Sequence, residues 1–367
     1  MVTGISIGAI TAAILGGVEK NPLEVLKEVW HERFVVTPPL LPPFDLIYQQ
    51  FTPALFQQSL AAFGNPGMYK LKPQLPPFLQ ALYDQFTPPI FECFLDATNL
   101  PDPRRFIAPF FNTSIFDLSP LKKMLADYVN LDYLNSRNGR QNPISVSVGA
   151  VNIETGMIKY WENRPPTGLN FDHVAASGSL PIAFPMAAVD GFHYWDGGVF
   201  SNTPLSPAIN RINGLKSESL RTATLPGTSA LQEEVKTELL VIELFPMQSP
   251  LPTNSQEVRS RQTQLQFTSR IQLDKKFADK INQMVSLLDQ IDRELPQDSP
   301  VRNSDEYQEL RKYKKIDRIT TIVADLAPAL ANAGDFSKSS LETRMAVGYE
   351  QACHILEQRD EAEAIRQ

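Results

Sequence analysis

The stretch Gly4-Ile5-Ser6-Ile7-Gly8 decides the fold that this sequence predicts, because it places a serine between two glycines immediately before an apolar segment. A serine hydroxyl is a poor nucleophile unless a base accepts its proton, and a sharp glycine-flanked turn lifts such a side chain clear of the backbone. The small and branched apolar residues 7–18 predict a buried helix directly after the turn. We expect Gly4 and Gly8 to be small because the strand and the helix approach each other closely there. Ser6 is therefore a candidate nucleophile.

The base that would activate Ser6 is the next question, since a G-x-S-x-G pattern also occurs by chance in a chain of 367 residues. Histidine is the usual base, and the order of an α/β-hydrolase triad requires it after the acid. Only His354 satisfies that order, and each of the four histidines is read more simply as an ordinary polar or capping residue. We therefore do not expect a Ser-His-Asp triad.

Asp196 is a stronger candidate for the base. It follows Phe192–Trp195, a run that predicts a strand, and precedes Gly197 and Gly198, which permit backbone conformations closed to other residues. A plain Asp-Gly turn is the alternative interpretation of the same residues.

Three blocks together resemble the patatin-like phospholipases, a family that uses a Ser-Asp dyad without histidine. The blocks occur in the order of the family and are Gly4-Ile5-Ser6-Ile7-Gly8-Ala9, Ala176-Ser177-Gly178-Ser179-Leu180-Pro181-Ile182-Ala183-Phe184-Pro185, and Asp190-Gly191 through Asp196-Gly197-Gly198-Val199 to Asn202 and Pro204. The tail around Asp335-Phe336-Ser337 is similar to the bacterial branch that carries an added C-terminal domain of unknown function.

The resemblance implies an α/β fold with three layers, α/β/α, around a mainly parallel central sheet. It assigns Ser6 as nucleophile and Asp196 as general base, with Gly4, Gly8, Gly197 and Gly198 supporting them. The implied reaction is hydrolysis of lipid acyl esters by a phospholipase or esterase through an acyl-serine intermediate, with no metal or organic cofactor. The implied partner is a lipid or acyl-ester substrate.

The family also carries a glycine-rich loop upstream of the serine, whose backbone N–H groups bind the oxyanion, and no residues of this sequence correspond to it. The N–H of Ile7 is then the oxyanion donor that remains, and loss of one donor lowers a rate about a hundred- to a thousand-fold. Two explanations stay open. Either the start is misassigned or shortened and the native protein is a lipase, or the chain is a natural remnant with impaired catalysis, a weak lipid-binding or interaction protein.

Composition narrows the partners and the location. A net charge of −7 gives no electrostatic basis for nucleic-acid binding. Cys93 and Cys353 lie far apart without C-x-x-C spacing, which favours a cytoplasmic setting and argues against a disulfide framework or a zinc site. The uncharged residues 1–18 lack a preceding Lys or Arg, so we do not expect a signal peptide or a membrane span. Peripheral membrane contact follows as an expectation from the substrate class.

The pattern along the chain predicts two domains, a catalytic domain over 1–250 and a mostly helical C-terminal extension over 251–367. Residues 37–120 are rich in proline and phenylalanine and predict either an insertion with a small core of its own or an apolar lid beside the site. Strands are expected near residues 144, 157, 192, 239 and 318, with a polar loop over 217–234 and a last helix that opens with a capping box at Ser339 and Glu342.

Overall fold

The computed structural model describes residues 1–36, 65, 67–71, 114, 116–136, 144–165, 168–201, 203–223, 236–245, 248–268, 271–323 and 336–364. The chain divides into two compact units. Residues 5–200 and 332–343 form the Ser6 unit, and residues 1–4, 201–331 and 344–367 form the second unit. Most of the insertion predicted over 37–120 lies outside the described residues, so its role as a lid stays a prediction.

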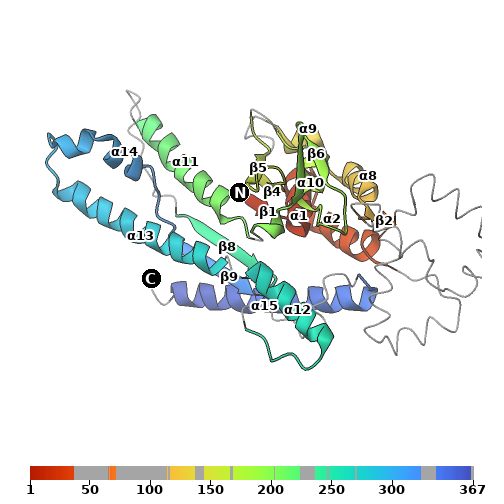
Figure 1. Cartoon of the computed structure of the whole chain (residues 1–367). Coiled ribbons are helices and arrows are strands. Elements are labelled where there is room, and N and C mark those ends of the chain that lie inside the picture. Colours follow the sequence, from red (N-terminus) through yellow and green to blue (C-terminus); the bar gives the residue numbers. More distant parts are fainter. Residues whose placement is uncertain are drawn as a thin grey trace, which may run out of the picture. The chain divides into compact units, whose positions relative to one another are not determined.

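The Ser6 unit contains a sheet in which four strands follow the order β5-β4-β7-β6. Figure 1 labels β4, β5 and β6 of this sheet. Their bounds are Val146–Asn152 for β4, Ile158–Glu162 for β5, Ala187–Val189 for β6 and Phe192–Asp196 for β7. All seven residues of β4 are buried, which means that both faces of this central strand are covered.

The combination of this sheet with helices confirms the α/β class, but the pairings described in it are antiparallel rather than mainly parallel. The strand β4 pairs antiparallel with β5 and β7, and β6 pairs antiparallel with β7. Short turns explain two of these pairings, because a connection of only a few residues can join only antiparallel neighbours. Gly156 has φ 68° between β4 and β5, and Asp190 and Gly191 have φ 49° and 81° between β6 and β7.

The helix α1 (Ile7–Gly17) is the buried helix that the sequence predicts, with Ala9, Ala12 and Ile14 at 0% exposure. Its C-terminal end packs closely on its neighbours. A Cβ added at Gly16 would lie 2.3 Å from Cγ2 of Val146, so the spacing between α1 and β4 requires glycine there. The helix α10 (Phe171–Ser177) also contacts β4.

The remaining elements of the Ser6 unit are short. They are α2 (Pro22–Glu28), the π-helix η1 (Val29–Arg33), β2 (Lys70–Leu71), β3 (Phe116–Asp117), α8 (Ser119–Tyr128), α9 (Leu131–Leu134) and the 3₁₀ helix η3 (Gly197–Val199). Asn21 caps α2 by accepting a hydrogen bond from the N–H of Leu23, as the Asn-Pro sequence predicts.

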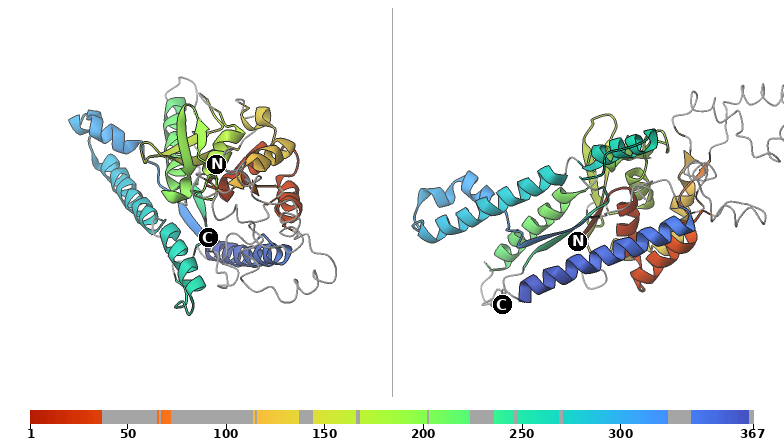
Figure 2. Two further views of the ribbon diagram at one scale, coloured as in Figure 1. Left: turned by 45° about the vertical axis from the view of Figure 1, so that its right-hand side comes forward. Right: turned by 90° about the horizontal axis from the view of Figure 1, so that it is seen from below.

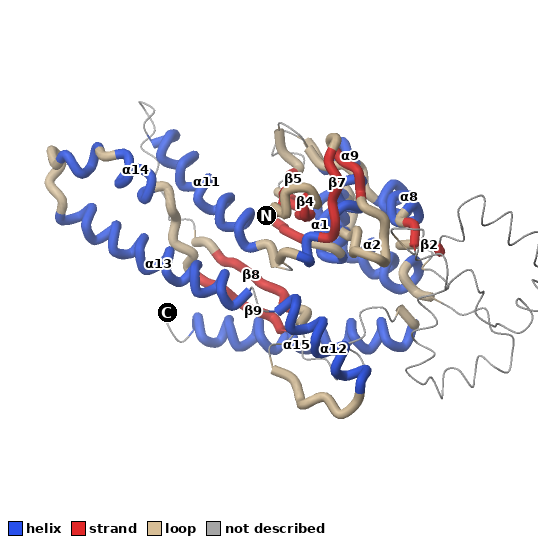
Figure 3. Tube along the Cα trace, viewed as in Figure 1, coloured by secondary structure: helices blue, strands red, loops and turns tan. Residues whose placement is uncertain are grey.

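The second unit is mostly helical and contains one parallel strand pair (Figure 3). Its strands are β1 (Val2–Gly4), β8 (Glu238–Glu243) and β9 (Arg318–Val323), and its helices are α11 (Leu205–Ala223), α12 (Ser255–Thr268), α13 (Ile271–Glu294), η4 (Pro300–Asn303), α14 (Asp305–Arg311) and most of α15 (Lys338–Ala364). Leu205 of α11 packs on Val241 of β8, with Ile209, Leu239 and Ile319 around them.

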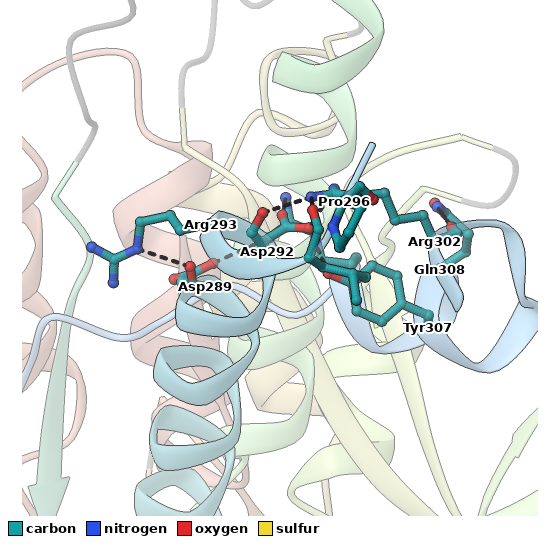
Figure 4. A network of polar contacts seen from close by, with 9 residues as sticks. Asp289, Asp292, Arg293, Pro296, Arg302, Tyr307 and Gln308 are labelled. Carbon is teal, nitrogen blue, oxygen red and sulfur yellow. Dashed lines mark hydrogen bonds and ion pairs between the residues drawn. The ribbon is translucent and has the colours of Figure 1, made fainter. Parts of the chain in front are cut away.

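A polar network closes the hairpin of α13 and α14 (Figure 4). The carboxylate of Asp292 accepts hydrogen bonds from the guanidinium of Arg302 at 2.8 Å and from the hydroxyl of Tyr307 at 2.5 Å, and it forms an ion pair with Arg311. These partners lower the pKa of Asp292, and the hydrogen bond from Tyr307 has the largest effect. The network joins the C-terminal end of α13 to η4 and α14. The helix α13 itself runs unbroken in both views of Figure 2.

Two local predictions were wrong. Residues 217–223 continue the helix α11, where a polar loop was expected over 217–234, and residues 224–234 lie outside the described part of the chain. The last helix begins at Lys338, one residue before Ser339, so that serine lies inside the helix and does not cap it. The domain boundary at residue 250 stays a prediction, and β8 before it pairs with β9 after it.

Candidate active site

Ser6 lies in a sharp turn between β1 and α1. Its backbone has φ 56° and ψ −122°, a conformation that non-glycine residues rarely adopt and that costs on the order of 1–3 kcal/mol. The next residue, Ile7, is the first of α1, so its N–H has no acceptor within the helix and points out of the helix N-terminus. The serine therefore sits in the strained strand-to-helix turn that the sequence pattern predicts.

Asp196 ends β7 and is buried, with 3% of its surface exposed. Its carboxylate accepts a hydrogen bond from the N–H of Gly198 at 2.7 Å, and the Ser6 side chain lies close enough to lower its pKa. Burial raises the pKa of Asp196 to about 6, although the contacts with Ser6 and Gly198 act in the opposite direction. The carboxylate is thus ionised at neutral pH and more basic than an ordinary aspartate.

The structure brings Ser6 and Asp196 together from positions 190 residues apart, and close packing around Gly197 holds them there. A Cβ at Gly197 would lie 2.6 Å from the carbonyl oxygen of Gly149 and 3.1 Å from the side chain of Ile5. Because backbone cannot yield as a flexible side chain does, only glycine fits at this position.

At Gly8 the expectation of a close approach between strand and helix was wrong. A Cβ added there would meet no described atom within 4 Å, so close approach of strand and helix does not explain this glycine. The tight contacts of α1 lie at its other end, where Cβ atoms at Gly16 and Gly17 would lie 2.3 Å from Val146 and 2.5 Å from Val129.

The last residue of α10, Ser177, and the turn that follows it carry hydrogen bonds to both candidate residues, and no role was predicted for them. The N–H of Ser6 donates to Oγ of Ser177 at 3.0 Å, and that hydroxyl donates to the carbonyl of Gly149 at 2.6 Å. The N–H of Asp196 donates to the carbonyl of Ser179 at 2.9 Å. Both serines fall in the second sequence block, but nothing in residue type or spacing says which backbone groups they meet.

Three of the four histidines have partners outside this site, as their reading as ordinary polar or capping residues implies. His173 accepts a hydrogen bond from the N–H of Asn170, caps α10 and stacks on Trp161 with ring centroids 4.7 Å apart. His193 contacts Glu154, and His354 contacts Gln358. Burial lowers the pKa of His173, so this ring is neutral at pH 7.

Three aliphatic side chains are exposed on the loop 180–186, immediately after Ser179. Leu180, Ile182 and Met186 expose 39%, 73% and 38% of their surface. Ile182 has φ 72°, a rare conformation for a β-branched residue. The loop is anchored by an aromatic cluster, in which Phe184 lies 5.4 Å from Tyr69 and 6.0 Å from Phe116 between ring centroids.

Two other kinds of site, a cavity and a metal site, come into question among the described residues. A cavity of about 820 Å³ does not include Ser6 or Asp196, and two of its cations, Arg33 and Lys70, are paired with Asp127 and Asp117. No group of three or more His, Cys, Asp or Glu side chains within the described ranges is placed to hold a metal ion. No helix in that part of the chain is both long and apolar enough to span a membrane.

The fold and the site define an α/β protein whose serine, in a strained turn before a helix, meets a buried aspartate. A family model described as Patatin-like phospholipase matches residues 1–209, which is more than half of the chain. The chain belongs to the patatin-like phospholipase family. A second model, for a domain described as Patatin phospholipase, matches residues 265–367.

Comparisons with individual proteins add little. No curated protein sequence matches the chain. Among solved structures, the crystal structure of VipD from Legionella pneumophila aligns at 14% identity over 95% of this chain and 61% of that chain. The TM-score is 0.28, too low to support an argument about the fold. This chain therefore spans less than two thirds of the length of that protein.

Proposed function

We propose that this protein is a serine lipid acyl hydrolase that uses Ser6 as nucleophile and Asp196 as general base. The observation that carries the proposal is the buried carboxylate of Asp196 beside the Ser6 side chain, which sits in a strained turn before a helix; burial raises the pKa of this carboxylate to about 6. A general base is most effective when its pKa lies near the working pH. Membership of the patatin-like phospholipase family supports lipid hydrolysis in general.

The proposed reaction has two halves. In the first, the Asp196 carboxylate takes the proton of the Ser6 hydroxyl while Oγ attacks the ester carbonyl carbon, and the tetrahedral intermediate expels the alcohol, which takes that proton. In the second, Asp196 takes a proton from water, the resulting hydroxide attacks the acyl-serine, and the fatty acid leaves as Ser6 regains its proton.

The oxyanion that forms in each half needs N–H donors near Ser6. We propose the N–H of Ile7 as one donor, because it follows the nucleophile and has no acceptor in the helix. Each additional preorganised donor raises the rate by about a hundred- to a thousand-fold, so a single donor would give slow turnover.

Hydrolysis of a fluorogenic acyl ester by wild type, Ser6→Ala and Asp196→Asn tests the proposal. Both substitutions are expected to lower kcat by roughly a thousand-fold or more. Asp172→Asn is the matched control, because its carboxylate is exposed on the nearby helix α10 and paired with Lys122. A Ser6→Ala rate equal to that of wild type would refute the enzyme and favour the alternative, a catalytically weak lipid-binding protein on the same fold.

We further propose that the protein contacts membranes peripherally and acts in the cytoplasm, with the loop 180–186 as the lipid-facing surface. Its exposed side chains Leu180, Ile182 and Met186 are aliphatic, and residues 180–189 carry no charge. The loop continues directly from Ser179, whose carbonyl accepts the N–H of Asp196. A lipid seated there would lie beside the proposed dyad.

A further inference from the structure

The strained backbone of Ser6 is held by one buried side chain. The Ser6 N–H lies 3.0 Å from Oγ of Ser177, which is 0% exposed. The conformation with φ 56° is unfavourable for serine, so it persists only where surrounding contacts fix it.

The hydroxyl of Ser177 cannot turn away from this role. Its proton is donated to the carbonyl oxygen of Gly149 at 2.6 Å, which leaves a lone pair of Oγ to accept the N–H of Ser6. Gly149 belongs to β4, a fully buried strand, and its carbonyl is also the atom that a Cβ at Gly197 would strike. The hydrogen bond is thus tied to a fully buried strand of the sheet in the Ser6 unit.

The turn that follows Ser177 holds the base, Asp196. The carbonyl of Ser179, two residues after Ser177, accepts the N–H of Asp196 at 2.9 Å. Ser179 uses its own hydroxyl elsewhere, donating it to the carbonyl of Ala175 at 2.8 Å. The C-terminal residue of α10 therefore holds the nucleophile by its side chain, and the turn after it holds the base by a main-chain carbonyl.

We infer that Ser177 is a positioning residue that keeps the Ser6 hydroxyl directed at Asp196 through the hydrogen bond to the Ser6 N–H. The inference rests on the proposed function, but the hydrogen bond itself does not. A small misplacement of a reacting group lowers the rate without weakening substrate binding. Loss of the Ser177 hydroxyl should therefore lower kcat and leave KM unchanged.

Two buried serines of the Ser6 unit give a pair of variants. Ser177→Ala removes a hydroxyl that donates to a main-chain carbonyl and accepts the N–H of Ser6. Ser145→Ala removes a hydroxyl that is 3% exposed and accepts a hydrogen bond from Nε of Arg164 at 3.1 Å, and this serine takes no part in the hydrogen bonds of Ser6 or Asp196 described above. Labelling of Ser6 by a fluorophosphonate is expected to slow about ten- to a hundred-fold in Ser177→Ala. Ser145→Ala should label at the wild-type rate even if both variants lose similar thermal stability.

Amide hydrogen exchange provides a readout that does not depend on catalysis. The Ser6 amide should exchange about fivefold faster or more in Ser177→Ala and at the wild-type rate in Ser145→Ala. If Ser177→Ala does not fold, Ser177→Cys keeps the size with a weak hydrogen-bonding group and should show both changes.

The outcomes separate the two ideas. Labelling of wild type but not of Ser6→Ala, together with a wild-type labelling rate in folded Ser177→Ala or Ser177→Cys, would overturn the positioning role and leave the hydrolase intact. Absence of Ser6-dependent labelling would overturn the hydrolase. An unchanged Ser6 exchange rate in the Ser177 variants would overturn the positioning role in either case.

Discussion

At the scale of the residue, burial changes the basicity of the Asp196 carboxyl group. A carboxyl group loses hydration when it is buried, which disfavours the charged form and raises its pKa. The contacts with the Ser6 side chain and the Gly198 N–H favour the charged form and keep the pKa near 6 instead of higher. Asp196 is thereby ionised at neutral pH, while it remains a better proton acceptor than an exposed aspartate.

The pH dependence of activity follows from this pKa. A general base works only when it is deprotonated, so kcat/KM should be constant above pH 7 and fall about tenfold for each pH unit below about 6. The measurement is kcat/KM for a soluble ester between pH 4.5 and 8. A profile that stays flat down to pH 4.5 would contradict the assignment of Asp196 as the base.

Ionisation of Asp196 should also affect folding stability, in the direction opposite to its effect on activity. The folded pKa of about 6 exceeds the usual 3.8, so between these values the folded protein binds more protons than the unfolded chain and its stability falls as the pH rises. Above pH 6 the full cost is present, on the order of 3 kcal/mol at 1.36 kcal/mol per unit.

Asp196→Asn removes that cost, and its amide oxygen still accepts the N–H of Gly198. We expect the free energy of unfolding of this variant to exceed that of wild type by up to about 3 kcal/mol at pH 8 and by little near pH 4. Urea denaturation at the two pH values measures the difference. A gap that does not change with pH would mean that Asp196 is not destabilised by its ionisation.

At the scale of the element, the loop 180–186 combines a fixed inner side with an apolar outer side. Phe184 packs on Tyr69 and Phe116, and the N–H of Phe116 donates to the carbonyl of Ala183 at 2.8 Å. Ile182 remains exposed at a positive φ. A β-branched residue in such a backbone costs free energy, and strain of this kind gathers at functional sites.

Ile182→Asp should lower activity on lipid surfaces without changing the hydrolysis of a soluble ester. Aspartate adopts positive φ more readily than isoleucine, so the fold should not suffer. Turnover of phospholipid vesicles should fall about ten- to a hundred-fold, because burial of an isoleucine contributes roughly 1.5–3 kcal/mol, while a soluble short-chain ester should be hydrolysed as by wild type.

The control for this experiment is Met157→Asp. Met157 is 64% exposed in the turn between β4 and β5, outside the loop. Equal losses on vesicles for the two variants would show that general surface charge, and not this loop, determines the effect.

At the scale of the whole molecule, the Ser6 unit includes a segment from the far end of the chain. Residues 332–343 belong to it, the N–H of Val36 donates to the carbonyl of Phe336 at 2.9 Å, and the rings of Phe34 and Phe336 lie 6.4 Å apart. Leu341, in the first turn of α15, is 2% exposed. The stability of the unit that holds the candidate site therefore depends on C-terminal residues.

Leu341→Ala should destabilise the Ser6 unit by about 2–5 kcal/mol, the usual cost of such a cavity. The three tryptophans, Trp30, Trp161 and Trp195, all lie within residues 5–200, so their fluorescence during urea unfolding reports on this unit. Leu287→Ala on α13, 56% exposed in the second unit, is the control and should leave the midpoint unchanged. An unchanged midpoint in Leu341→Ala would mean that residues 332–343 add no stability to the unit.

The sequence by itself determined the local features. Apolar periodicity and turn residues predicted α1, β4, β5, β7 and the strands near 239 and 318, because these depend on neighbours within a few residues. The two glycine-flanked blocks also identified Ser6 and Asp196 as a candidate pair. The positions of these residues in their elements required no knowledge of the packed fold.

Only the tertiary structure decided how these parts meet. It gave the antiparallel pairings of the sheet, the need for glycine at Gly197 rather than Gly8, and the attachment of residues 332–343 to the Ser6 unit. It also revealed Ser177 as the partner of the Ser6 N–H. Contacts between residues more than a hundred positions apart depend on strand register and burial, and neither leaves a periodic trace along the chain.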